Sequence, residues 1–164
     1  MSERIGSSIT SRPIHAGDEE FLYRVYASTR QEELAQTGWD ETQKSAFLRM
    51  QFDAQSDYYE EHYRGAEFSL VLSDGHPAGR LYVARWQEEI RIVDVALLPE
   101  HRGRGIGTYL LNVLISESEE SGKPLSIHVE RFNPALRLYE RLGFRAVADK
   151  GVYLLLERLP GATR

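Results

Sequence analysis

The 164-residue chain contains no cysteine, which excludes disulfide frameworks, cysteine-ligated zinc sites and thiol nucleophiles. It has no apolar run long enough to cross a bilayer, and Met1–Arg4 lacks an apolar signal core. Positive charge is in deficit, with a formal net charge of −5, whereas nucleic-acid-binding proteins usually present a basic face. These absences predict a cytoplasmic protein that engages neither nucleic acid nor a membrane.

Metal-ligand spacing is also missing from the sequence, so we expect no metal site. The five histidines are scattered along the chain: His15, His62, His76, His101 and His128. His128 alternates with Ile127 and Val129 in a strand-like segment, a pattern typical of a structural histidine. Acidic residues between Asp40 and Glu61 fall on or near a predicted long helix. They indicate a solvated face, or a surface that favours a cationic substrate.

The chain does contain a strand, a turn rich in glycine and arginine, and a helix in direct succession. The strand is predicted over Ile90–Leu98 and the amphipathic helix over Tyr109–Glu120. Between them Gly103, Gly105 and Gly107 alternate, and glycine lets backbone N–H groups approach a ligand closely. A helix N-terminus attracts anions, and the flanking arginines at positions 102 and 104 add positive charge. This order predicts a pyrophosphate cradle.

Two common phosphate motifs do not fit this segment. It has no Gly-Lys-Ser/Thr run of the P-loop type, and neither glycine register completes Gly-x-Gly-x-x-Gly. The alternative to a ligand-binding loop is an ordinary glycine-rich turn between a strand and a helix. A second segment is needed to decide between these interpretations.

That second segment runs from Asn133 to Phe144 and predicts a short helix after a strand over Ser126–Glu130. Asn133 is expected to cap the helix, with proline at its first position, and Gly143 is expected to end it. Tyr139 lies on this helix. Taken alone, a tyrosine at helical spacing is usually a core aromatic residue.

Arg102-x-x-Gly105-x-Gly107 and the segment from Asn133 to Phe144 together resemble the acyl-CoA-binding and thioester-facing segments of the GNAT superfamily of N-acetyltransferases. The resemblance covers Glu89 to about Leu159, and upstream only the order of elements agrees. It implies an α/β (mixed α+β) fold, with a largely antiparallel mixed sheet of six to seven strands and helices on both faces. We expect one domain over residues 1–164, in which residues 159–164 form a loose tail.

The resemblance also assigns roles to residues, with acetyl-CoA as the donor substrate. Tyr139 would protonate the leaving thiolate, and a backbone N–H near Ala96 or Leu97 would bind the thioester carbonyl. Because no cysteine can carry an acetyl group, we expect direct transfer in a ternary complex. The expected cofactor-binding residues are Ala96, Leu97, Leu98, Arg102, Gly103, Arg104, Gly105, Ile106, Gly107, Thr108 and Asn133.

The base that deprotonates the attacking amine is predicted from carboxylates near the strand Ile90–Leu98. Asp94 ranks first, because a carboxylate inside an apolar strand needs a reason. Glu89 ranks second and Glu130 third, and a water-mediated route competes with all three. The structural alternative for Asp94 is a salt bridge or an exposed strand position.

The sequence therefore predicts an acetyl-CoA-dependent N-acetyltransferase acting on a small-molecule or peptide amine, with a homodimer left open. One alternative is an acyltransferase with another acyl donor or a hydroxyl acceptor. The other is a non-catalytic acyl-CoA sensor. Specificity would come from the N-terminal helices, Gly17 to Arg64, and from the loop around a terminal hairpin, which is predicted from Ala146–Val147 and Val152–Leu156.

The upstream elements are predicted from periodicity and capping signals. A first strand is expected over Ile9–Ile14, followed by a helix whose cap is Asp18. Asp40 and Gln43 have the spacing of a capping box and predict a long helix to about Tyr63. An antiparallel meander should follow, with strands at residues 68–72, 78–86 and 90–98.

Overall fold

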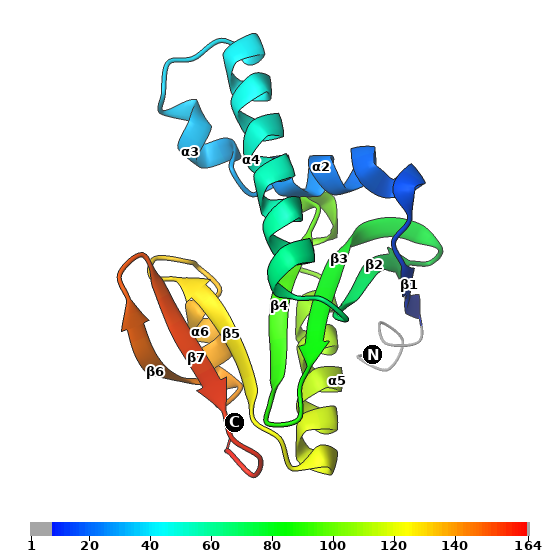
Figure 1. The fold of residues 1–164 in the computed structure, drawn as a ribbon, viewed down its shortest axis with the longest axis vertical. Coiled ribbons are helices and arrows are strands. Elements are labelled where there is room, and N and C mark those ends of the chain that lie inside the picture. Colours follow the sequence, from blue (N-terminus) through cyan, green and yellow to red (C-terminus); the bar gives the residue numbers. More distant parts are fainter. Residues whose placement is uncertain (1–7, 164) are drawn as a thin grey trace. The chain divides into compact units, whose positions relative to one another are not determined.

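The computed structural model describes residues 8–163. Over this range seven strands form one sheet in the order β1-β2-β3-β4-β5-β7-β6 (Figure 1). The strands are β1 (Ile9–Pro13), β2 (Glu67–Ser73), β3 (His76–Arg85), β4 (Ile90–Leu97), β5 (Leu125–Glu130), β6 (Arg145–Lys150) and β7 (Tyr153–Arg158). The α-helices are α2 (Glu19–Ser28), α3 (Gln31–Ala35), α4 (Glu41–His62), α5 (Ile106–Ser121) and α6 (Leu136–Arg141), and two 3-10 turns are η1 (Ala16–Asp18) and η2 (Pro99–His101).

The strand pairing is mixed and largely antiparallel, as the sequence predicted. β1 pairs with β2, β5 with β7, and β6 with β7, all in antiparallel fashion. β4 and β5 run parallel, which requires the crossover that α5 supplies between them. The expected strands and the terminal hairpin are all present within a few residues of their predicted bounds.

The chain packs as two compact units, which are described separately. The first contains the chain up to Leu81 together with Val95–Gly107, and the second contains Tyr82–Asp94 together with the chain from Thr108 onward.

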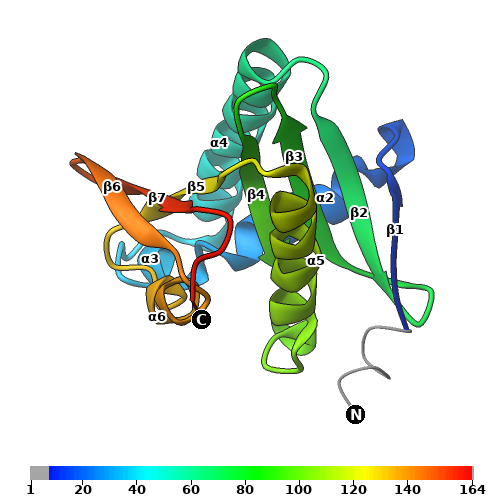
Figure 2. The same cartoon turned by 90° about the horizontal axis from the view of Figure 1, so that it is seen from below.

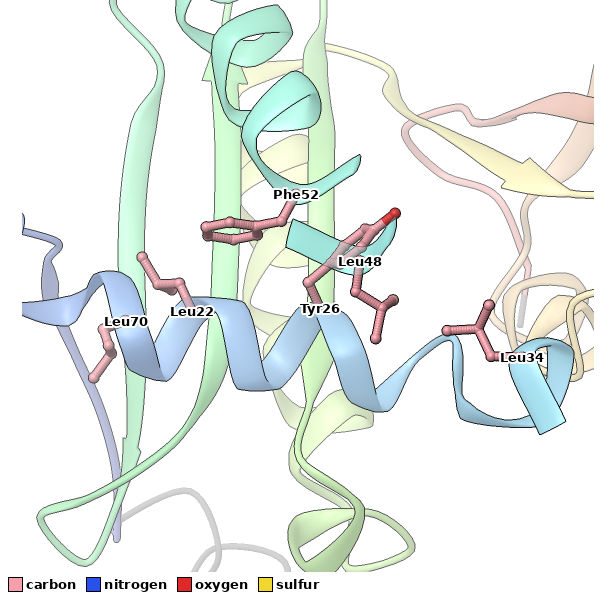
Figure 3. Packing of buried hydrophobic residues seen from close by; sticks show 6 residues of the cluster. All are labelled: Leu22, Tyr26, Leu34, Leu48, Phe52 and Leu70. Atoms are coloured by element: carbon pink, nitrogen blue, oxygen red, sulfur yellow. The ribbon is translucent and has the colours of Figure 1, made fainter. Parts of the chain in front are cut away.

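In the first unit, α2 and α4 lie on one face of strands β1 and β2 (Figures 1 and 2). Figure 3 shows the cluster that holds these elements together, with side chains from both helices, from α3 and from β2. Its members are Leu22, Tyr26, Leu34, Leu48, Phe52 and Leu70. The hydroxyl of Tyr26 donates to Oε1 of Gln51 at 3.0 Å, so the polar tip of this buried ring has a partner.

The N-termini of α4 and α2 compare differently with the predictions. At α4 the predicted capping box is present, since Gln43 N–H donates to Oδ1 of Asp40 at 2.8 Å and the Asp40 N–H donates back to Oε1 of Gln43 at 3.0 Å. Asp18 occupies the N-cap position of α2, as predicted, but its side chain makes no capping hydrogen bond to that helix. The Asp18 carboxylate instead accepts two hydrogen bonds of 2.9 Å from the Arg12 guanidinium and one from the backbone N–H of His15. These bonds, the Arg12 pair first, lower the pKa of Asp18 to about 2.

The second unit contains β5, β7 and β6, and α6 lies against these strands (Figure 2). Arg158, only 1% exposed, donates to the carbonyls of Leu142 and Ala162 at 2.7 Å and to the Glu119 carboxylate at 2.9 Å. Gly161 N–H donates to the same carboxylate at 2.8 Å. In the segment expected to form a tail, the Gly161 N–H and the Ala162 carbonyl therefore have side-chain partners, Glu119 and Arg158; Arg164 lies outside the described residues.

Candidate functional site

The glycine- and arginine-rich segment forms a loop that leads directly into α5. Gly103 and Gly105 have φ values of 70° and 84°, in the left-handed region that favours glycine. The helix begins at Ile106, three residues earlier than predicted, so Gly107 and Thr108 lie in its first turn. The N–H groups of a first turn have no partner within the helix. They are available to an anion at this position.

The space beside Gly107 is open. A Cβ atom built on this residue would meet no other atom within 4 Å, and its φ lies outside the left-handed region. The fold of the described residues therefore does not require glycine at this position. Its absence of a side chain leaves the first turn of α5 open to close approach by a ligand.

The Arg102 side chain makes two hydrogen bonds that anchor the glycine- and arginine-rich loop, in addition to its positive charge. Its Nε donates to the carbonyl of Leu97 at 2.9 Å, and Nη2 donates to Oγ of Ser28 at 3.1 Å. The side chain thereby links the loop to the end of β4 and to the last residue of α2. Arg104 is exposed. Of the two arginines flanking Gly103, the structure thus ties Arg102 to protein acceptors.

The end of β4 is shaped by a glycine that the sequence reasoning did not single out. A Cβ atom on Gly79 would lie 2.1 Å from the carbonyl oxygen of Ala96 and 2.9 Å from the Cα of Leu97. The backbone of β3 therefore passes too close to β4 for any side chain, and Leu98 N–H donates to the Ala78 carbonyl at 2.8 Å beside it. An isolated glycine inside a strand is the sequence signal of such a close approach.

In the second unit the negative charge of Asp94 acts on Tyr139. Tyr139 lies in α6, is 6% exposed, and packs edge-to-face against Phe144 with ring centroids 5.5 Å apart. Burial, and then the negative charge of Asp94, raise the pKa of the phenol to about 12. The phenol is therefore protonated at neutral pH and can donate a proton.

Asn133 caps the turn before α6. Its Oδ1 accepts a hydrogen bond of 2.8 Å from the backbone N–H of Ala135, and its carbonyl accepts one of 3.0 Å from Leu136. The helix itself begins at Leu136, two residues after the predicted start at Pro134, because the intervening residues form a turn. The prediction that Asn133 caps the helix is wrong, because Ala135 occupies the N-cap position and no side chain caps it. The amide oxygen of Asn133 instead accepts from the backbone of the turn that precedes the helix.

Glu89 belongs to a polar cluster with Arg91, Ser126 and His128. Its carboxylate accepts a hydrogen bond from the Ser126 hydroxyl and lies 3.5 Å from Nη2 of Arg91. Arg91 also donates from Nε to Ser126 Oγ at 2.8 Å, and its Nη1 lies 3.4 Å from Nδ1 of His128. Glu89 immediately precedes β4, and five extended residues span roughly 16 Å, so Glu89 lies far from Asp94. The third candidate base, Glu130, ends β5.

No group of three or more histidine, cysteine or acidic side chains within residues 8–163 could hold a metal ion. In the same part of the chain no helix combines the length and the apolar character needed to span a bilayer.

Comparison with known proteins connects these features. The model of the acetyltransferase (GNAT) family matches residues 23–144. A streptothricin acetyltransferase from Streptomyces lavendulae is 36% identical over 81 residues, which cover 47% of this chain and 43% of that protein. A [ribosomal protein bS18]-alanine N-acetyltransferase from Haemophilus influenzae is 38% identical over 61 residues, covering 37% of this chain and 42% of that protein. The matched region therefore spans less than half the length of these two relatives.

Solved structures share the fold. The PaiA N-acetyltransferase from Thermoplasma acidophilum, solved in complex with coenzyme A, superposes with a TM-score of 0.70 at 18% identity, covering 93% of this chain and 99% of that chain. An acetyltransferase from Thermus thermophilus gives a TM-score of 0.64 at 22% identity over 92% of this chain and 95% of that one.

Proposed function

The chain belongs to the acetyltransferase (GNAT) family, and from this premise we propose that it transfers an acetyl group from acetyl-CoA to an amine. The observation that carries the proposal is the open first turn of α5 beside Gly107. Coenzyme A carries a pyrophosphate, and bare N–H groups at a helix N-terminus bind such anions. The related PaiA enzyme was solved with coenzyme A and has the same fold, which supports this assignment.

The thioester would lie near the end of β4, next to the loop in sequence. A backbone N–H at Ala96 or Leu97 would donate to the carbonyl oxygen as it gains negative charge. Gly79 and Arg102 support this role, because both constrain the backbone at the end of β4. Gly79 allows β3 to approach it closely, and Arg102 donates a hydrogen bond to the Leu97 carbonyl. A donor held by rigid backbone needs no rearrangement during the reaction.

Tyr139 would supply the proton to the leaving thiolate. In the reaction the neutral amine attacks the carbonyl carbon, a C–N bond forms, and the C–S bond breaks. The thiolate of coenzyme A takes the phenolic proton, and the amine gives up a proton to Asp94, directly or through water. The raised pKa of Tyr139 suits this role, since the phenol stays protonated until a strong base forms beside it. No cysteine is present to form an acetyl-enzyme, so direct transfer is favoured.

Two measurements test the proposal. Isothermal titration calorimetry with coenzyme A tests binding, and release of the free thiol from acetyl-CoA with a panel of amines tests transfer. Binding together with amine-dependent thiol release supports an acetyltransferase. Binding without release from any amine would indicate a non-catalytic acyl-CoA sensor, and failure of the folded protein to bind coenzyme A would contradict the proposal altogether.

A further inference from the structure

The guanidinium group of Arg158, in β7, joins three segments of the second unit. Its Nε donates to the carbonyl of Leu142 and its Nη2 to that of Ala162, both at 2.7 Å, while Nη1 lies 2.9 Å from Oε2 of Glu119 in α5. The residue is 1% exposed, and a charged group at this depth destabilises a fold unless it is paired and hydrogen-bonded. These contacts therefore hold the guanidinium and the segments around it in one arrangement.

The contact with Leu142 is made at the C-terminal end of α6. This helix has six residues, and a helix so short is marginal by itself. No side chain caps its N-terminus, and the carbonyl of its C-cap residue Leu142 lies beyond the reach of the N–H groups of the helix. Arg158 supplies that partner, and its positive charge suits the negative end of a helix. The position of α6 thus depends on Arg158.

Gly143 shows how closely the end of α6 approaches this arginine. A Cβ atom on Gly143 would lie 3.1 Å from Nε of Arg158 and 2.9 Å from the carbonyl oxygen of Thr163. Its φ of 101° is in the left-handed region. Both the space and the backbone conformation therefore favour glycine, and the end of the helix lies directly against the arginine.

The segment that Arg158 anchors also determines where Tyr139 lies. The carbonyl of Tyr139 accepts hydrogen bonds from the N–H groups of Leu142 at 3.1 Å and of Phe144 at 3.0 Å, the residues on either side of Gly143. The Tyr139 ring packs edge-to-face against the ring of Phe144. A shift of Leu142 would therefore move both the backbone and the ring of Tyr139.

We propose that Arg158 is a positioning residue for acetyl transfer: by holding the carbonyl of Leu142, it keeps the phenolic hydroxyl of Tyr139 where it can protonate the leaving thiolate. This role rests on the proposed function and adds to it a residue 19 positions from Tyr139 in sequence. A displacement of about 1 Å can lower turnover by about 100-fold, so loss of the Arg158 contact should reduce the rate as well as the stability.

A double-mutant cycle with Tyr139→Phe tests this role. Arg158→Met keeps an unbranched side chain but removes all three contacts, and we expect kcat to fall by about 30- to 100-fold while coenzyme A affinity and the KM for acetyl-CoA change by less than about threefold. In the Tyr139→Phe background the same substitution should lower kcat by less than about threefold, because no phenolic proton is left to position. An equal loss in both backgrounds, or an unchanged kcat in Arg158→Met, would overturn the inference.

Two further variants separate positioning from folding, with all rates measured at a temperature at which circular dichroism shows each variant folded. Arg85→Met is the matched control, because Arg85, in β3, donates to the carboxylate of Glu117, which also belongs to α5. Its kcat should stay near that of the wild type. Arg158→Lys keeps the buried charge but lacks the planar fork that reaches three acceptors, so its kcat should fall between those of the wild type and Arg158→Met. Should Arg158→Met fail to fold, Arg158→Lys replaces it in the same cycle.

A measurement without turnover distinguishes this role from the proposed function. In protein with carbon-13-labelled tyrosine, the NMR signal of Tyr139 is identified by its loss in Tyr139→Phe. We expect this signal to shift in Arg158→Met and to stay in place in Arg85→Met. An unchanged Tyr139 signal in folded Arg158→Met would refute the inference even if acetyl transfer is observed. Failure of the proposed function would instead appear as absent coenzyme A binding or absent thiol release in the wild type.

Discussion

Replacement of Gly107 should separate folding from coenzyme A binding. Because a Cβ atom here meets nothing within 4 Å and φ lies outside the left-handed region, Gly107→Ala should leave the fold intact and can stabilise it by about 0.5–1 kcal/mol. Valine is a weaker helix former than alanine by roughly half a kcal/mol, so Gly107→Val should stay near wild-type stability. Both side chains, however, would fill the space through which the pyrophosphate approaches the N–H groups of α5.

The loss of binding follows from the hydrogen bonds that such a side chain would prevent. A hydrogen bond to a charged group contributes about 1.5–3 kcal/mol. The loss of two such bonds would lower the affinity for coenzyme A by about 100-fold or more. Calorimetry of the two variants should show a graded loss, larger for valine. Ser116→Val is the matched control, because it adds the same side chain at an exposed position of the same helix. Wild-type affinity for coenzyme A in a folded Gly107→Val variant would refute the reasoning.

Three further predictions concern other parts of the chain. Tyr139→Phe should reduce turnover by about 100-fold while coenzyme A affinity and melting temperature barely change, and unchanged turnover would identify Tyr139 as a packing residue only. Asp18 has a pKa of about 2, below its unfolded value, so its pairing with Arg12 stabilises the fold above about pH 4 and this contribution is lost as the pH falls toward 2. Asp18→Asn should therefore cost about 1–2 kcal/mol in urea unfolding at pH 7 and less at pH 2.5; an equal cost at both pH values would contradict the ion-pair account. Gly79→Ala should destabilise by about 2 kcal/mol or more, because its Cβ would meet the Ala96 carbonyl oxygen, and a wild-type unfolding midpoint would show that β3 and β4 can move apart there.

Much of the fold was predictable because its signals are local. The capping box of Asp40 and Gln43 is completed within four residues, and it predicted the start of the 22-residue helix α4. The turn before β3 likewise uses positive φ at Asp74 and Gly75, residues that commonly adopt this conformation. The alternation of Gly103, Gly105 and Gly107 predicted a backbone open to an anion, since glycine acts through what its own position lacks.

The five-residue helix α3 was missed for the opposite reason. It has no side-chain cap and is too short for periodicity to detect, and the burial of Leu34 in the first-unit core gives it a packing partner. Arg102 was predicted as a phosphate-facing charge, but the structure shows it donating to Leu97 and Ser28. Ser28 is 74 residues away in sequence, so no local pattern could indicate that contact.

The sequence by itself determined which chemical groups are available: a glycine loop before a helix, a tyrosine in a short helix, and no cysteine. The tertiary structure alone decided how those groups are tuned. The pKa of Tyr139 depends on burial and on a carboxylate 45 positions earlier, and the pKa of His128 is lowered by burial and by an arginine 37 residues away. Protonation states respond to charges a few ångströms away in space, and strand pairing and chain packing, rather than neighbours in sequence, bring those charges together.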